Sequence, residues 1–220
     1  MLHDNITALK GIGAAKAKLF EKVGVVTVQD LLYYFPRGYE DRTKTVPIYE
    51  AYDSQTVCIK ATVFSAVRQR RISKTLSLYS VELADESGQM QATWFNNKYI
   101  KNSIHKGETY IFYGKVRRIG PRKTMENPIF ERLDKPQVVT GKIVPLYPLT
   151  EGLTQKIVQT AMTQALDAAA ELSDPLPRSL LARYSLVPLR QAVENIHFPS
   201  DFEAFEQARR RLVFEELLTL

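Results

Sequence analysis

The sequence predicts an α+β protein in which a small β-barrel lies between two helical segments. Two observations support this prediction. Apolar and polar residues alternate in short runs between residues 56 and 131, as in strands with one buried face. On both sides of this region, apolar residues recur at helical spacing, and residues typical of helix ends bound these runs. We therefore expect a helical segment over residues 1–45, a barrel over 46–145 and a second helical segment over 146–220.

The first segment predicts three short helices. An apolar pattern over residues 2–9 predicts the first, and Ala14–Lys22, which is rich in strong helix formers, predicts the second. Thr27 and Asp30 have the spacing of a capping pair at the start of a third helix, Val28–Phe35. Together these elements predict a compact group of helices before the barrel.

A glycine-rich turn joins the first two predicted helices. Gly11 and Gly13, with Lys10, Lys16 and Lys18 nearby, resemble the turn of a helix-hairpin-helix unit. Glycines let backbone N–H groups approach a phosphate closely, and a following helix N-terminus favours negative charge. The alternative is a plain turn between two packed helices, because a single G-x-G is a weak signal. Gly11 and Gly13 are therefore candidate phosphate contacts.

Residues 39–52, across the boundary between the first segment and the barrel, predict an irregular connector, which includes Pro47. It contains three tyrosines, Tyr39, Tyr49 and Tyr52. Aromatic rings bury a large apolar surface when they pack. We expect these three rings to pack the connector against the barrel rather than to bind a ligand.

The barrel region predicts three strands, a short helix and two further strands. This order is that of an OB-fold, a five-stranded Greek-key barrel whose second and third strands and flanking loops commonly bind oligonucleotides. Turn residues separate the predicted elements, for example at Asp85–Gly88. The expected strands are Thr56–Val63, Leu76–Leu83, Gln89–Phe95, Thr109–Val116 and Thr124–Glu131, with the helix over Lys98–Ile104.

The stretch from Gln89 to Ile104 carries the main candidate binding residues. Its apolar residues alternate onto one face of a strand, whereas Phe95 falls on the opposite, otherwise polar face. Tyr99 follows four residues later, between Lys98 and Lys101. Two aromatic rings beside cations suit stacking on unpaired bases next to phosphates. The alternative is that both rings close the end of the barrel.

Positive charge is concentrated in the barrel region. The chain has a net charge of +6, and residues 60–123 contain thirteen Lys and Arg against four Asp and Glu, a surplus of nine. Such a surplus favours an acidic partner, although charged loops are often only solvated. We expect basic side chains in two loops, where they could hold two DNA backbones on either side of the aromatic pair. The candidates are Arg68, Arg70, Arg71 and Lys74 between the first two strands, and Arg117, Arg118, Arg122 and Lys123 between the last two.

The last segment is predicted to be helical. Thr154 begins a helix with a regular apolar face, and shorter helices are expected over residues 178–184 and 188–196. Ser200 and Glu203 have capping-box spacing before a final helix. That helix ends in a run of apolar residues without a stop signal, so we expect it to pack on a further domain of a longer chain.

Several classes of function are excluded by the sequence. No apolar run approaches the roughly 18 residues of a membrane span, and the single Cys58 cannot form an internal disulfide. With no signal peptide, this favours the cytoplasm. The three histidines lack metal-ligand spacing, and no phosphate-binding P-loop or catalytic triad is present. We expect a non-catalytic, metal-free and cofactor-free monomer.

Several runs of residues together carry a resemblance to a known family. They are LKGIGAAKAKLFEKVGVVTVQDLLYYFPRGYEDRT (Leu9–Thr43), WFNNKY (Trp94–Tyr99), GKV (Gly114–Val116), IHFP (Ile196–Pro199) and ARRRLVFEELL (Ala208–Leu218). In these runs the sequence resembles the N-terminal part of the RecG family of bacterial DNA helicases. The resemblance implies an ATP-dependent enzyme that migrates branches at stalled forks and Holliday junctions during recombination and repair. ATP and Mg would bind motor domains outside this chain, and this portion would be the wedge that splits the junction, with Phe95 and Tyr99 as its stacking pair. One departure is that Met125–Phe130 lacks the His and second acid usual in the family.

Three hypotheses about function follow. The favoured one is a wedge that binds branched DNA and is attached to its own motor domains. The second is a free-standing OB-fold module for single-stranded DNA or tRNA, which would prefer plain single strands. The third is a protein-interaction adaptor that uses Tyr33, Tyr34 and Phe35 or the terminal leucines. Only the first two predict a steep dependence of binding on salt.

Overall fold

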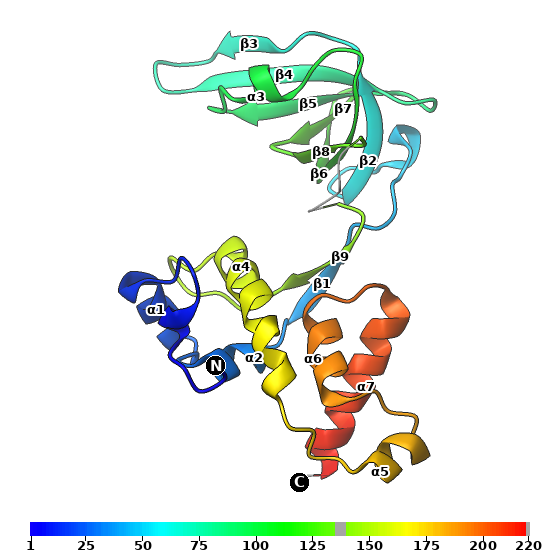
Figure 1. The fold of residues 1–220 in the computed structure, drawn as a ribbon. Coiled ribbons are helices and arrows are strands. Elements are labelled where there is room, and N and C mark those ends of the chain that lie inside the picture. The colour runs from blue at the N-terminus through cyan, green and yellow to red at the C-terminus, as the bar shows by residue number, and fades with distance from the viewer. Residues whose placement is uncertain (135–139, 219–220) are drawn as a thin grey trace. The chain divides into compact units, whose positions relative to one another are not determined.

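The computed structural model describes residues 1–134 and 140–218 (Figure 1). The chain forms two compact units. One unit combines Met1–Glu40 with Ile143–Leu220, and we call it the helical unit. The other is Asp41–Lys142, and we call it the barrel unit. Each unit is described separately below.

The barrel unit contains a closed ring of strands in the order β2, β4, β5, β7, β6 and back to β2 (Figure 1). The ring closes where β6 pairs along β2, from Thr56 opposite Lys115 to Thr62 opposite Thr109. Only β5 and β7 run parallel within it. This arrangement confirms the predicted OB-fold. The bounds are β2 (Thr56–Val63), β4 (Ser77–Ala84), β5 (Gln89–Phe95), β6 (Thr109–Ile119) and β7 (Arg122–Glu126), with the short helix α3 (Ile100–Ser103) between β5 and β6.

The basic run after β2 is a strand, so the prediction that it forms a loop was wrong. It forms β3 (Arg68–Arg71), which pairs antiparallel with β4. The loop is thereby reduced to a tip around residues 72–76, closed by a hydrogen bond from the Ile72 N–H to the Leu76 carbonyl (2.8 Å). Long charged side chains suit β3 because they discourage further strand pairing at an edge.

The predicted last strand is divided into two. Asn127, with φ of 45°, ends β7, and β8 (Ile129–Arg132) follows. Asparagine adopts this left-handed conformation more readily than most residues. The eleven-residue β6 is long enough to pair with β8 through its first half and with β7 through its second. Arg117, Arg118, Arg122 and Lys123 consequently lie on strands instead of in the loop that the sequence predicted.

The interior of the barrel is filled by alternate residues of its strands. Met90, Ala92 and Trp94 are all buried, as the alternation in β5 predicted. Ile100 and Ile104, on and after α3, are each 2% exposed and lie in the same core. The remaining large members of this core include Ile59, Val63, Tyr79, Val81, Leu83, Tyr110, Phe112, Val116 and Met125.

The connector tyrosines do not pack as predicted. In the 3-10 turn η2 (Ile48–Glu50), Ile48 and the following Ala51 take the buried positions. Tyr49 and Tyr52 therefore project into solvent. Tyr39 belongs to the helical unit, where its ring contacts Phe205 edge-on with centroids 4.6 Å apart.

The helical unit is built from both ends of the chain. Its N-terminal part differs from the prediction, because the first helix is a single 3-10 turn, the third is shorter, and part of the expected connector forms the strand β1. The bounds are η1 (Ile6–Ala8), α1 (Ala14–Glu21), α2 (Val28–Leu32), β1 (Gly38–Asp41), β9 (Ile143–Leu146), α4 (Gln155–Ala165), η3 (Leu166–Glu171), α5 (Arg178–Arg183), α6 (Leu189–His197) and α7 (Phe202–Leu218). β1 pairs with β9.

Capping interactions set the ends of several helices. The Asp30 N–H donates to the Thr27 hydroxyl (3.1 Å) and the Thr27 N–H donates to the Asp30 carboxylate (2.8 Å), which confirms the predicted capping box. Thr154 caps α4, also as predicted. The cap of α7 is Asp201 and not Ser200, because the Asp201 carboxylate accepts the Ala204 N–H (2.8 Å). An ionised acceptor at this position also interacts favourably with the helix dipole.

One core joins the two ends of the chain in the helical unit. Phe20 and Leu31 from the N-terminal part pack in the same cluster as Val158 and Met162 from α4. His197 is fully buried beside this core. Its Nε2 donates to the Leu32 carbonyl (2.8 Å), so its Nδ1 accepts from the Tyr147 hydroxyl (2.9 Å). Burial lowers the pKa of His197 to about 4.

Among the described residues, no helix combines the length and the apolar character required to cross a bilayer.

Candidate nucleic-acid interface

Phe95 ends β5 on the outer face of the barrel, where its side chain is 39% exposed. Leu78 on β4 lies opposite Phe95, and Arg70 on β3 lies opposite Leu78. Directly paired residues of antiparallel strands project to the same side of a sheet. Arg70, Leu78 and Phe95 therefore form a row across three strands. Arg68 lies two positions from Arg70 and shares its face.

The backbone around Phe95 is fixed by two asparagines. The Asn127 side-chain oxygen accepts the Phe95 N–H (3.0 Å) from beyond the end of β7. Asn96, with φ of 53°, continues the pairing with β4, because its N–H donates to the Ser77 carbonyl and its side chain accepts the Ser77 N–H (2.8 Å each). On the other side, the Trp94 indole donates to the Pro128 carbonyl (2.9 Å). Phe95 is thus an exposed ring on a constrained backbone.

Tyr99 is 70% exposed and immediately precedes α3. Its N–H donates to the Asn97 side chain (3.2 Å), which orients the turn between β5 and α3. The Lys98 ammonium lies 5.7 Å from the Tyr99 ring centroid, within the range of a cation–π contact. Lys101, also exposed, lies 6.0 Å from the ring of Tyr79. The Lys98 ammonium thus lies beside one ring of the aromatic pair, and Lys101 follows Tyr99 by two residues.

The β3–β4 hairpin offers two uncommitted arginines. Within residues 1–134 and 140–218, the Arg68 and Arg70 side chains have neither a hydrogen bond nor an ion pair, and both are exposed. Arg71 is used internally, because its guanidinium donates to the Ser73 and Lys74 carbonyls (3.2 Å each). Arg71 thus supports the hairpin tip, whereas Arg68 and Arg70 are available to an anion.

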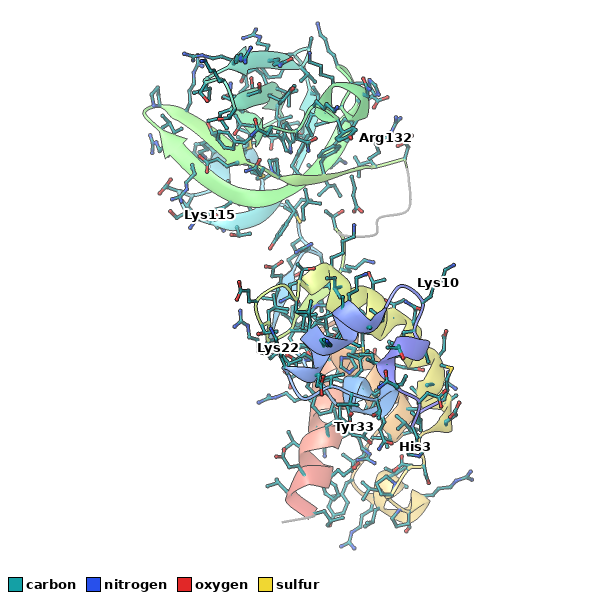
Figure 2. The ribbon with its side chains drawn as sticks, turned by 90° about the vertical axis from the view of Figure 1, so that its left-hand side faces the viewer. His3, Lys10, Lys22, Tyr33, Lys115 and Arg132 are labelled. Atoms are coloured by element: carbon teal, nitrogen blue, oxygen red, sulfur yellow. The ribbon has the colours of Figure 1, made fainter. Side chains whose placement is uncertain are left out.

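The β6–β7 hairpin is partly committed to the barrel itself. Lys123 Nζ donates to the Ile48 and Tyr49 carbonyls (2.6 and 2.7 Å), so this ammonium braces η2. The Arg118 Nε donates to the Gly120 carbonyl (3.3 Å), and Arg117 donates to the Ser54 hydroxyl (3.4 Å). The side chains of Lys115, which Figure 2 labels on β6, and of Arg122 have no such partner in the described part of the chain.

The two basic hairpins lie toward opposite ends of β5. Phe95 pairs with Leu78, near the β3–β4 tip, whereas Gln91, near the other end of β5, pairs with Thr124 on β7. β5 has six residue steps, so its ends are about 20 Å apart at 3.3 Å per residue. The aromatic pair therefore adjoins the β3–β4 hairpin. The sequence predicted that the pair would lie between the two basic hairpins, and the structure does not show this central position. Both hairpins still flank the β4–β5 face.

The glycine turn lies in the helical unit. Gly11 has φ of 84°, and Gly13 is the N-cap of α1. The Lys16 ammonium donates to the Gly11 carbonyl (2.8 Å), and the Gln164 side chain on α4 is bonded to both backbone groups of Lys10. The turn is thus firmly held, and Lys10, labelled in Figure 2, is exposed beside it, whereas Lys22 lies at the other end of α1. Because η1 is one 3-10 turn, only one α-helix flanks the glycines.

Sequence reasoning missed the roles of Asn96, Asn127 and the connector tyrosines. The signal for the two asparagines was their position directly after strands, since asparagine tolerates positive φ and accepts hydrogen bonds through its side chain. Which N–H groups they accept depends on cross-strand pairing, which the local sequence does not contain. Across the described residues, no group of three or more His, Cys, Asp and Glu could hold a metal ion.

Comparison with known proteins gives a consistent match over the whole chain. Residues 5–168 match the family model of the RecG wedge domain. The chain is 31% identical to the ATP-dependent DNA helicase RecG of Synechocystis, covering 100% of this chain and 28% of that protein. It is 32% identical to the Escherichia coli protein of the same name, covering 97% of this chain and 32% of that protein.

A solved structure of RecG bound to a three-way DNA junction superimposes with a TM-score of 0.89 and 27% identity. This match covers 100% of the chain and 30% of that structure. The chain thus spans about three-tenths of the length of the curated relatives that it matches.

Proposed function

The chain belongs to the RecG helicase family and contains its wedge region, and from this premise we propose that the barrel unit parts DNA strands at branch points. The observation that supports the proposal most is the exposed pair Phe95 and Tyr99, held on a constrained backbone beside Arg70, Lys98 and Lys101. An aromatic pair in this setting suits stacking on bases that have lost their partners. The solved RecG structure that this chain resembles contains branched DNA, which agrees with this assignment.

The proposed wedge is passive. Stacking of a base on Phe95 or Tyr99 contributes about 1–3 kcal/mol. Opening one step of duplex DNA costs about 1.4 kcal/mol on average. Two stacked bases would therefore offset the opening of the first pairs at a junction without supplying work. Continued movement requires an energy source, and the sequence contains no phosphate-binding P-loop.

The basic side chains would hold the arms of the junction. Arg68, Arg70, Lys98 and Lys101 would neutralise phosphates around the aromatic pair. Phosphate contacts position a protein on nucleic acid but do not distinguish sequences. We therefore expect selection for branched structure over any particular sequence. The turn at Gly11 and Gly13 is proposed as a further phosphate contact of the helical unit, through N–H groups at the start of α1.

The function of the whole protein is proposed from its relatives, which are named ATP-dependent DNA helicases. We assign ATP hydrolysis, with Mg, to motor domains outside this chain. The wedge would then act on replication forks and Holliday junctions during recombination and repair in the bacterial cytoplasm. The helical unit would connect the wedge to these motor domains.

The wedge role is tested by the double variant Phe95→Ala/Tyr99→Ala. We expect its affinity for a three-way junction and a fork to fall about tenfold or more, because two stacked bases are lost. Affinity for linear duplex should change little. The measurement is a titration of the 220-residue chain against fork, junction, duplex and single strand at several salt concentrations.

Phe95→Tyr/Tyr99→Phe is the matched control, because it keeps both rings, and it should bind like the unaltered chain. Unchanged junction binding by the alanine variant would overturn the wedge role. A preference of the unaltered chain for plain single strands would instead support a free-standing single-strand module. Weak binding that is insensitive to salt would favour a protein-interaction adaptor.

A further inference from the structure

Three large hydrophobic side chains are at least 70% exposed in the described part of the chain, and all belong to the barrel unit. One is Tyr99, already assigned to the wedge; the others are Tyr49 (77%) and Tyr52 (71%). A tyrosine ring buries a large apolar area when it finds a partner. Two such rings three residues apart, almost fully in solvent, form a surface that the wedge does not use.

The backbone that carries Tyr49 is firmly attached to the barrel. Its N–H donates to the Ser87 hydroxyl (2.9 Å), and the preceding Ile48 N–H donates to the Asp85 carboxylate (2.7 Å). Lys123 donates to the carbonyls of both residues. The buried Ile48 side chain anchors the same turn. The Tyr49 ring is therefore exposed because its surroundings hold it outward, and not because the segment is loose.

Tyr52 is held in a similar way. Its N–H donates to the Gln55 side chain (3.0 Å), and the loop that follows is bonded to β6. There the Ser54 N–H donates to the Val116 carbonyl, and the Val116 N–H donates to the Gln55 carbonyl (2.8 Å each). A ring on a fixed backbone loses little conformational freedom when a flat ligand stacks on it.

The charge around the two tyrosines favours an anionic ligand. The run from Lys115 to Lys123 carries five cationic side chains and no acid. The acids close by are Glu50 and Asp53 in sequence, and Asp85 and Glu86 in the turn that holds η2. The Asp85 carboxylate is occupied, because it accepts the Ile48, Ser87 and Gly88 N–H groups. The Asp53 carboxylate is already occupied, because it accepts the Arg118 N–H (2.7 Å). Exposed aromatic rings beside a cationic strand pair match the chemistry of single-stranded nucleic acid, whose bases stack while its phosphates meet positive charge.

The position of this surface relates it to the wedge. Asp85 and Ser87, which hold η2, form the turn that leads into the first residue of β5, whereas Phe95 is its last residue. The two aromatic surfaces thus lie toward opposite ends of one strand, about 20 Å apart. About six nucleotides at the 3.4 Å spacing of stacked DNA would cover this distance, and fewer if the strand is extended.

We propose that Tyr49 and Tyr52 form a second stacking site, which holds unpaired bases of one DNA strand after that strand has separated at Phe95 and Tyr99. This inference rests on the proposed function, since the wedge supplies the single strand. The ligand is single-stranded DNA continuous with a branch point. The site would keep the separated strand from pairing again while the junction moves.

The test compares Tyr49→Ala/Tyr52→Ala with Phe95→Ala/Tyr99→Ala on two probes. One probe is a three-way junction with no single-stranded arm, and the other is a fork with a ten-nucleotide single-stranded arm. The Tyr49/Tyr52 variant should lose about tenfold affinity for the armed fork and bind the armless junction normally. The Phe95/Tyr99 variant should lose affinity for both. Tyr49→Phe/Tyr52→Phe keeps the rings and should bind both like the unaltered chain.

Each outcome decides one assignment. Equal affinity of the Tyr49/Tyr52 variant and the unaltered chain for the armed fork would overturn the second site, whatever the wedge variant does. An equal loss on both probes would also overturn it, because the contact would then be with duplex. A wedge variant without effect, beside a Tyr49/Tyr52 variant that loses only the armed fork, would overturn the wedge role alone. Thermal unfolding checks that the alanine variants fold, as expected for side chains this exposed.

Discussion

Asn127 and Asn96 show how single residues can determine the geometry of a binding surface without contacting a ligand. Each directly follows a strand at positive φ, and each side-chain oxygen accepts a backbone N–H of a neighbouring strand. In this way Asn127 binds Phe95 itself, and Asn96 extends the ladder by one residue beyond it. A hydrogen bond of this kind contributes about 1 kcal/mol. The consequence is that Phe95 occupies a defined place at the rim of the barrel.

Asn127→Gly tests this positioning. Glycine accepts the positive φ but lacks the acceptor, so we expect the free energy of unfolding to fall by about 1 kcal/mol. Junction affinity should fall by up to about fivefold if the looser Phe95 costs a similar amount in the complex. Urea unfolding and junction titration measure the two effects. Asn127→Asp, which keeps the oxygen, should lose less of both, and a glycine variant identical to the parent in both assays would contradict the role.

At the scale of elements, the strand β3 determines the direction in which each arginine of the basic run Arg68–Arg71 points. A loop would present all of its arginines in varied directions, whereas a strand alternates them. Arg68 and Arg70 consequently share the face of Phe95, and Arg71 points elsewhere and supports the tip. The charge of the run was visible in the sequence. The sequence did not show which arginines share the face of Phe95 and which one supports the tip, because this depends on the pairing of β3 with β4.

Arg68→Gln/Arg70→Gln should weaken binding through lost phosphate contacts. Each phosphate that a protein neutralises on duplex DNA contributes about −0.9 to the slope of log affinity against log salt. We therefore expect the slope of junction binding to become shallower by roughly one to two. The readout is a salt titration with the 220-residue chain. Arg71→Gln is the control, because its guanidinium is bonded to carbonyls, and a slope change as large as that of the double variant would refute the assignment.

For the whole molecule, the sequence predicted those features that depend on residues close together in the chain. Alternation gave the OB-fold strands and the exposed position of Phe95, and capping residues gave the starts of α2 and α4. It did not predict that helices from both chain ends share one core, since Phe20 and Val158 are brought together only by folding. The exposure of Tyr49 and Tyr52 was missed for the same reason. It follows from Ile48 and Ala51 filling the core instead.

The two units have separate cores, and this predicts separate responses to acid. The pKa of His197 is lowered to about 4 in the folded helical unit, against 6.5 for an ordinary histidine. Between these values the unfolded state binds the extra proton, so stability falls as pH decreases from about 6.5 toward 4. At pH 5 the expected loss is about 2 kcal/mol relative to pH 7, because the neutral ring must stay buried between Leu32 and Tyr147. Carboxylates with lowered pKa values, such as that of Asp30, act mainly at lower pH.

Two probes can distinguish the units in one sample. Trp94, the single tryptophan, reports on the barrel core, whereas circular dichroism in the far ultraviolet reports mainly on the helices, most of which belong to the helical unit. On urea unfolding at pH 5, we expect the dichroism midpoint to fall relative to pH 7 and the Trp94 fluorescence midpoint to change less. His197→Gln removes the titrating ring, so its stability should be lower at pH 7 but nearly equal at the two pH values. Equal shifts of both probes, or a glutamine variant with the pH dependence of the parent, would show that the buried imidazole does not control this response.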